Sequence, residues 1–250
     1  MEHPYISVSR IRCYLSCSLK YYFRYELKLP SPMNGALLIG KAVHSSVEAA
    51  LRLKAERKID MPIDTLMDVY SQNFHQLLLT DNIDLEGKER SDLKDTGYGL
   101  TKLFGKEILP KKNPAFIEHE FNLSFENVPY VFKGFIDEIS EDGVLSDLKT
   151  AAKSWSEDSI LTDMQLSGYC LAYKHIFGKL PKGLRLDILI KTKTPKTQIL
   201  TCGPRDERIL ERFLRIMGNT VALIDSKIFV PSESVFNCST CDYGEECRKF

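Results

Sequence analysis

Two aspartates and a lysine stand close together in the segment GFIDEISEDGVLSDLKT, residues 134–150. Apolar and polar residues alternate on both sides of a Glu-Asp-Gly turn, so the segment predicts two antiparallel strands joined by a hairpin. Asp137 lies near the end of the first strand and Asp147 near the end of the second, with Lys149 two residues further on. Because alternate residues of a strand share a face, Lys149 should emerge beside Asp147.

Carboxylates on neighbouring strands could ligate one divalent cation. Strand neighbours lie about 4.8 Å apart, and hard oxygen ligands suit Mg²⁺ or Mn²⁺. A lysine beside the ion could orient or deprotonate a water, or neutralise charge that develops on a phosphate. Phosphodiester hydrolysis requires these groups. The competing interpretation is a surface salt bridge next to a turn, which would contribute little to stability.

The composition limits the classes of protein to consider. The chain has 250 residues, of which 43% are hydrophobic and 27% charged, as in an ordinary globular protein. Its 34 basic and 34 acidic residues cancel, so nucleic-acid binding would have to come from local patches. We find no apolar run near the roughly 20 residues of a membrane helix and no signal-peptide pattern, and we expect a cytoplasmic protein without a membrane partner.

Helical patterns surround the hairpin. The first predicted helix has Ser9 as its N-cap and ends at Pro30, with Ile11 and Leu15 on its buried face. A long helix carrying His44 follows, and residues 50–110 indicate a helical insertion that is broken at 81–92. The strands 115–126, 129–139 and 143–151 predict an antiparallel meander, and the rest of the chain predicts a helix within 154–178, strands at 183–194 and 196–202, and a helix within 204–230.

The ordered set of motifs resembles the PD-(D/E)XK nucleases, and within them the RecB-like exonucleases that include the Cas4 group. The carriers are GFID and DLKT of the hairpin, a Gly-x-x-x-His pattern ending at His44, and a Gln-x-x-x-Tyr pattern from Gln165 to Tyr169. This resemblance covers nearly the whole chain, and it implies one α/β domain, 1–250. The domain would have a restriction-endonuclease-like mixed central sheet flanked by helices. Ser146, where the family often has an apolar residue, and the long insertion depart from the pattern.

The resemblance implies roles for individual residues. The metal ligands for Mg or Mn would be His44, Asp137, Asp147 and the carbonyl of Leu148. Lys149 would be the catalytic lysine, and Gln165 and Tyr169 would hold Lys149 or a phosphate from one helical face.

Each of these assignments has a plainer alternative. His44 could be a packed or surface histidine, and Gln165 and Tyr169 could form a half-buried helix face. Glu120, which alternates with Glu118 in FIEHEF, could support the site from the next layer or lie on a solvated strand face.

Three cysteines lie close together near the end of the sequence, at positions 238, 241 and 247. The resemblance supplies a fourth ligand from the first helix, Cys17, and implies a [4Fe–4S] cluster that ties the tail at 232–250 to that helix. Structural zinc satisfies the same spacing, and free thiols in a loose tail are the plain alternative. Cys13 could replace Cys17. Cys170 and Cys202 suit small core positions.

The function implied is metal-dependent hydrolysis of DNA, as an exonuclease on single strands or DNA ends. A basic and aromatic segment at 20–28 offers Lys20 and Arg24 as DNA contacts, although several of its aromatic residues must pack in the core. A second class stays open, in which the chain is a DNA-end-binding adaptor or processing subunit of a recombination or CRISPR spacer-acquisition complex. The intact Asp137, Asp147 and Lys149 set favours the enzyme.

Overall fold

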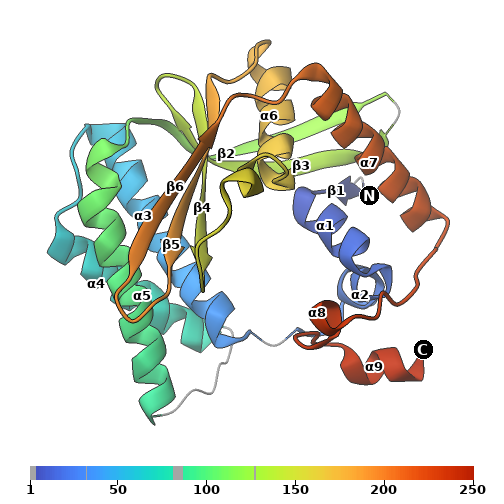
Figure 1. Cartoon of the computed structure of the whole chain (residues 1–250), viewed down its shortest axis with the longest axis horizontal. Coiled ribbons are helices and arrows are strands. Elements are labelled where there is room, and N and C mark those ends of the chain that lie inside the picture. The colour runs from blue at the N-terminus through green and yellow to red at the C-terminus, as the bar shows by residue number, and fades with distance from the viewer. Residues whose placement is uncertain (1–3, 32, 81–86, 127) are drawn as a thin grey trace.

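The computed structural model describes residues 4–31, 33–80, 87–126 and 128–250, and in these residues a sheet of six strands forms the middle layer. Helices cover both faces of this sheet (Figure 1). Parallel and antiparallel pairs occur in the same sheet. The predicted fold class, a mixed central sheet flanked by helices, is therefore confirmed.

Strand β3 (Val128–Ser140) organises the sheet. Antiparallel β2 (Pro114–Phe125) pairs along one of its edges, while β1 (Tyr5–Ile6) and β4 (Val144–Ala151) share the other edge. Strand β5 (Gly183–Ile190) runs parallel to β4, and β6 (Lys196–Cys202) pairs antiparallel with β5. The predicted meander of β2, β3 and β4 is confirmed, whereas the two-residue strand β1 carries too little pattern to be predicted.

The hairpin of β3 and β4 opens where its acids stand. The turn is built as predicted, with Gly143 at φ 83°, a conformation that glycine adopts at little cost. In the described residues, β3 pairs with β4 at Ile139↔Leu145 and Glu138↔Ser146 and no further. Strand β1 joins this edge of β3 only at positions 131 and 132, so residues 133–137 of β3 have an uncovered edge. The strands thus separate as they reach Asp137 and Asp147.

Three long helices cover one face of the sheet, namely α3 (Gly35–Arg57), α4 (Ile63–Thr80) and α5 (Gly87–Glu107). Their apolar sides form one core with Leu148 of β4 and Leu189 of β5. The helical character predicted for 50–110 is present, but the predicted break at 81–92 is only partly testable. Residues 81–86 lie outside the described residues, and 87–92 are helical. That this region is an insertion stays a prediction.

The opposite face is covered by α1 (Val8–Ser16), α6 (Met164–Phe177) and α7 (Glu207–Asp225). Aspartates cap both later helices, because Asp163 accepts from the backbone of Leu166 and Asp206 from that of Ile209. The helix α6 connects the parallel strands β4 and β5 as a crossover. Short 3₁₀ turns at Leu109–Lys111 and Glu157–Ile160 complete the connections.

The first helix differs from the prediction in two ways. Its N-cap is Ser7, whose hydroxyl accepts from the backbone of Arg10, and Ser9 lies within the helix. The helix is also interrupted at Cys17, which has extended backbone angles (φ −161°, ψ 109°). It resumes as α2 (Ser18–Tyr21) and a π-helical turn, Tyr22–Glu26. The buried residues of α1 are Val8, Ile11 and Tyr14, and Leu15 is 52% exposed although its spacing predicted burial.

The tail returns to the N-terminal segment. Two short helices, α8 (Val235–Cys238) and α9 (Gly244–Lys249), lie beside α2 (Figure 1). A small separate core of Leu19, Phe23 and Tyr243 joins the N-terminal segment to the chain at the start of α9.

Candidate active site

The predicted metal ligands come from two layers of the fold. His44 lies on α3, and its Nε2 atom is 2.7 Å from the carbonyl oxygen of Leu148 on β4. The helix is held there because its apolar residues pack on the sheet in the core that includes Leu148. A cavity of about 20 Å³ opens beside this contact, and Asp137 lines it. A space of that size holds about one water molecule or ion.

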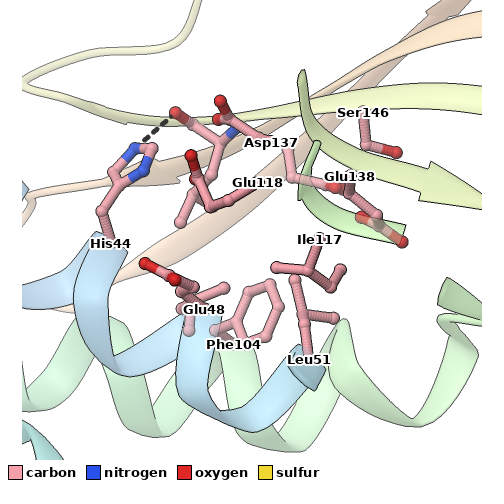
Figure 2. A pocket seen from close by; sticks show the side chains of 12 residues that line it. His44, Glu48, Leu51, Phe104, Ile117, Glu118, Asp137, Glu138 and Ser146 are labelled. Atoms are coloured by element: carbon pink, nitrogen blue, oxygen red, sulfur yellow. Dashed lines mark hydrogen bonds between the residues drawn. The ribbon is translucent and has the colours of Figure 1, made fainter. Parts of the chain in front are cut away.

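Acidic side chains face the same cavity. Figure 2 shows Glu48 of α3 and Glu118 of β2 directed toward the space between His44 and Asp137. Burial, and then the charges of Asp137 and Glu48, raise the pKa of Glu118 to about 7, while Arg52 opposes them. The cavity thus gathers negative charge that a cation would stabilise.

Asp147 and Lys149 form a second, adjoining group. Their side chains share a face of β4, as predicted, and Lys149 Nζ lies 2.8 and 2.6 Å from the two carboxylate oxygens of Asp147. Asp147 is 2% exposed. Burial, and then the charge of Asp137, raise the pKa of Asp147 well above its ordinary value. Burial alone would lower the pKa of Lys149, but Asp147 and Asp137 together raise it.

Tyr169 of α6 positions Asp137. Its hydroxyl donates to Asp137 Oδ1, and the backbone N–H of Leu148 donates to Asp137 Oδ2 over 3.4 Å. Gln165, one turn earlier, interacts with the Tyr169 hydroxyl. Burial and the charge of Asp137 raise the pKa of Tyr169 well above 10, so the hydroxyl keeps its proton. Tyr169 therefore holds a carboxylate, and that Gln165 and Tyr169 also hold Lys149 or a phosphate stays a prediction.

Glu118 is an acid of this cavity that the alternating sequence pattern does not identify. Glu120 points to solvent and pairs with Lys133 at 3.3 Å, so it belongs to the solvated strand face. Glu118 has φ 49°, a left-handed backbone that is uncommon for a residue with a side chain. Register places it opposite Asp137, between the pairs Ile117↔Glu138 and His119↔Ile136. Such strained positions gather at functional sites, and no sequence pattern signals this one.

A buried ionic network lies directly behind the acids and was missed from sequence. Lys112 Nζ contacts Glu138 Oε2 at 2.6 Å, Asp187 Oδ2 at 2.5 Å and the Ser146 hydroxyl at 3.1 Å. Arg185 adds a 2.8 Å contact to Asp187. Glu138 and Ser146 are the last paired residues before β3 and β4 separate, so Lys112 ties the hairpin together at that point. Ser146, the departure from the family pattern, is a member of this network.

We tested whether these residues suit a divalent cation. Among residues 4–31, 33–80, 87–126 and 128–250, no three His, Cys, Asp or Glu side chains lie close enough to hold one ion. Asp147 is turned toward Lys149, and His44 and Asp137 share the cavity with a backbone carbonyl. The donor types, two carboxylates, a carbonyl and an imidazole, fit Mg²⁺ or Mn²⁺, and a cation would offset the like charges that raise the pKa of Asp147.

Comparison with known proteins decides the family. The family model for the PD-(D/E)XK nuclease superfamily matches residues 5–248. The chain belongs to the PD-(D/E)XK nuclease superfamily. A search of curated proteins finds no match.

One solved structure agrees on the fold of this PD-(D/E)XK chain. A crystal structure from Eubacterium rectale, of a protein provisionally named an exonuclease, aligns with TM-score 0.60 and 14% identity over 99% of this chain and 88% of that one. The structure of SSO0001 aligns with TM-score 0.38 and 17% identity, over 92% and 93% of the two chains, which is too weak to support an argument. The described residues contain no helix that is long and apolar enough to cross a membrane.

The predicted cluster ligands of this PD-(D/E)XK protein line one small pocket. Cys17, Cys238, Cys241 and Cys247 surround a space of about 30 Å³. The helix interruption turns Cys17 toward the tail, where its sulfur accepts from the backbone N–H of Ser232 over 3.4 Å. The role of Cys17 as a ligand stays a prediction. Cys13 packs against the main core instead, and burial raises the pKa of its thiol.

The predicted DNA contacts lie away from the acids. Lys20 lines the cysteine pocket. Arg24 lies 5.6 Å from the ring centre of Tyr25. Neighbouring Tyr21 and Phe23 are 0% and 5% exposed, which confirms that aromatic residues of this segment pack in the core. That Lys20 and Arg24 bind DNA stays a prediction.

Proposed function

We propose that this PD-(D/E)XK protein is a metal-dependent deoxyribonuclease that hydrolyses phosphodiester bonds where β3 and β4 separate. One observation carries the proposal. His44 and the Leu148 carbonyl, 104 positions apart in sequence, meet at 2.7 Å beside the cavity that Asp137 lines. A purely structural histidine would not need two neighbouring strands to bring carboxylates toward the same space.

The ligand set of the proposal is His44, Asp137, Asp147 and the Leu148 carbonyl. A bound Mg²⁺ or Mn²⁺ would polarise the phosphate and lower the pKa of a water. Lys149 carries its positive charge next to Asp147 and is 25% exposed, so it can approach a phosphate and stabilise negative charge that develops there. Tyr169 fixes the carboxylate of Asp137 by donating to it, and Gln165 supports Tyr169.

The substrate we propose is DNA, as single strands or free ends, with exonucleolytic cleavage. This preference derives from the family resemblance. A groove of about 800 Å³ supports it, because the groove starts at Asp137, Gln165 and Tyr169 and continues past Lys133 and the exposed ring of Phe135. Such a groove can accept a strand that leads to the acids.

We further propose that Cys17, Cys238, Cys241 and Cys247 hold a [4Fe–4S] cluster. In such a cluster each thiolate binds a different iron, so the four sulfurs stand further apart than around one ion. Four thiols around one pocket support a metal group at this place, and the family resemblance favours the cluster over zinc. Iron and zinc analysis of anaerobically purified protein, with its visible spectrum, tests this. Stoichiometric zinc without iron would contradict it.

A cleavage assay tests the nuclease. Wild-type protein with Mn²⁺ should shorten end-labelled linear single strands and leave circular single strands intact, and Asp147→Ala should abolish this. Asp142→Ala is the matched control, because Asp142 lies in the turn of the same hairpin and pairs with exposed Lys182. Equal cleavage by wild type and Asp147→Ala would refute the catalytic assignment. Tight binding of DNA ends without any cleavage would favour the adaptor class.

A further inference from the structure

A second hollow, separate from the groove that starts at Asp137, lies beside the first turn of α6. It has a volume of about 700 Å³ and lies between α1, the chain after β4, and the start of α6. Arg12, Lys153 and Trp155 line it, and the remaining lining residues are small or polar apart from Met164: Ser154, Ser156, Ser159, Thr162 and Asp163. None of these residues belongs to the predicted ligand or catalytic set.

The backbone of Trp155 is hydrogen-bonded to the sheet. Its backbone N–H donates to Gln198 Oε1 at 2.9 Å, and Gln198 Nε2 donates to its carbonyl at 2.8 Å. Because Gln198 lies on β6, these two bonds attach the loop to the sheet. The ring is half-buried against the main core and half open to the hollow. A fixed aromatic ring can stack on a flat partner with little further loss of conformational freedom.

The charge of the hollow favours an anion. Arg12 and Lys153 are exposed, and neither makes an ion pair with any residue in the described part of the chain. The acid that lines the hollow is Asp163, and its carboxylate accepts from the backbone N–H of Leu166 as the N-cap of α6. Two unpaired cations therefore face one acid that is already engaged with the helix.

The hollow adjoins the proposed catalytic corner, which we define as His44, Asp137, Asp147, Leu148 and Lys149. Asp163 is close enough to act electrostatically on both Asp147 and Lys149. Asp163 and Met164 line the hollow, while Gln165 and Tyr169 of the same helix line the groove that reaches Asp137. Hollow and groove are thus lined by neighbouring residues at the start of the same helix.

We propose that the Trp155 hollow binds a single-stranded segment of the nucleic-acid substrate. The indole stacks on one unpaired base, and Arg12 and Lys153 contact the phosphates beside it. Stacking on a protein ring requires a base that is free of its own duplex neighbours, so the ligand class is single-stranded. The proposal rests on the proposed function, since it assigns one side of the substrate path, with the groove at Phe135 forming the other.

Intrinsic fluorescence tests the proposal directly, because Trp155 is the only tryptophan of the chain. Full-length protein is titrated with oligo(dT) of about 12 nucleotides in EDTA, where no cleavage can occur. Single strands should quench the emission saturably, and a blunt duplex of equal length should need at least a tenfold higher concentration. Binding is followed in parallel by anisotropy of a labelled strand.

Variants separate stacking from charge. Replacing Trp155 by Leu should weaken single-strand binding about 5- to 100-fold. The pair Arg12→Ser and Lys153→Ser should lower the slope of log K against log salt by about 1.4, since each lost phosphate contact removes about 0.7. Arg208→Ser, on an exposed position of α7, is the matched control and should change neither quantity. Trp155→Phe keeps a stacking ring and should bind nearly as well, which guards against a folding defect in the Leu variant.

The outcomes distinguish this proposal from the nuclease proposal. Strands that bind by anisotropy without changing the emission overturn it, and so does equal quenching by the duplex. If the Trp155→Leu variant cleaves DNA at the wild-type rate and binds single strands with unchanged affinity, the proposal for the hollow is overturned and the nuclease proposal stands. Saturable quenching by single strands in a protein that never cleaves supports this site and refutes the proposed activity.

Discussion

The catalytic corner and the cysteine pocket both collect reactive side chains from distant parts of the chain, but they are built differently. The corner lies on the sheet, where register sets the place of Asp147 and Lys149 and where helix packing brings His44 to Leu148. The cysteine pocket lies between α2 and two short helices of four and six residues, joined by a core of only three buried side chains in the described residues.

Because of this difference, we expect the corner to be preorganised by the protein and the cysteine pocket to depend on a bound ligand. The corner keeps its arrangement through strands, a buried ionic network and the Tyr169 hydrogen bond, so it needs no metal for its placement. The cysteine pocket is held by contacts such as those of the exposed Asn237 amide to Ser16 and Ser232, which water can replace. Loss of the proposed cluster should therefore loosen the tail, while loss of the proposed divalent ion should change chemistry without changing the fold.

The largest effect is expected at Lys149. Lys149→Met should lower the cleavage rate at least 10²- to 10³-fold, because it removes the charge that stabilises the developing phosphate charge. Circular dichroism should show an intact fold. Lys182→Met removes an exposed lysine–aspartate pair between the chain before β5 and Asp142 of the hairpin turn, and it should leave the rate within about twofold. A rate that falls equally in both variants would contradict a special role for the corner.

The next largest effect is expected behind the acids. Lys112→Met leaves Glu138 and Asp187 buried without their shared cation, at 3% and 2% exposure. Breaking such a network should lower the free energy of unfolding by about 3–5 kcal/mol, measured by urea denaturation. Lys58→Met, at an exposed pair with Glu141, should cost less than about 1 kcal/mol. Similar losses in both variants would show that the network does not stabilise the hairpin.

Removal of the proposed cluster should affect the tail alone. Cys238→Ser should leave the midpoint for unfolding of the main core close to the wild-type value. It should also make the segment after Val230 sensitive to limited proteolysis. Cys170→Ser, which alters a buried cysteine of the main core, should give the opposite pattern. A tail that stays protease-resistant in Cys238→Ser would mean that protein contacts hold it without a cluster.

The smallest effect concerns Glu118 and pH. Its pKa is raised to about 7, from about 4.5 in the unfolded chain, so the folded state loses stability as pH rises through that interval. Glu118→Gln removes this penalty. In EDTA it should gain about 1–3 kcal/mol over wild type above pH 7, with the gain vanishing below pH 4.5. Asp137 and Glu48 face the same cavity. If the stability gain of Glu118→Gln is constant with pH, repulsion of the Glu118 carboxylate by these two acids is excluded as the cause of the gain.

The parts of this site that depend on local sequence pattern could be predicted from the sequence. Alternation and a Glu-Asp-Gly turn sufficed to place Asp147 and Lys149 on one face of a hairpin strand, and both strands were found. The separation of β3 from β4 was not predictable, because both strands continue beyond their last described pair, Glu138↔Ser146. Glu118 was missed because a left-handed residue breaks the alternation, and Lys112 because its partners come from three strands. The break at Cys17 overrode a helical period that continues through it.

The most direct test of the account is a crystal of the wild-type protein soaked in Mn²⁺ and measured for anomalous scattering. We predict a single strong peak in the cavity between His44 Nε2, the Leu148 carbonyl and Asp137, with the Asp147 carboxylate turned from Lys149 toward it. The peak should disappear in His44→Ala crystals. A cavity without a peak, in crystals of protein that cleaves DNA with Mn²⁺ in solution, would contradict the account.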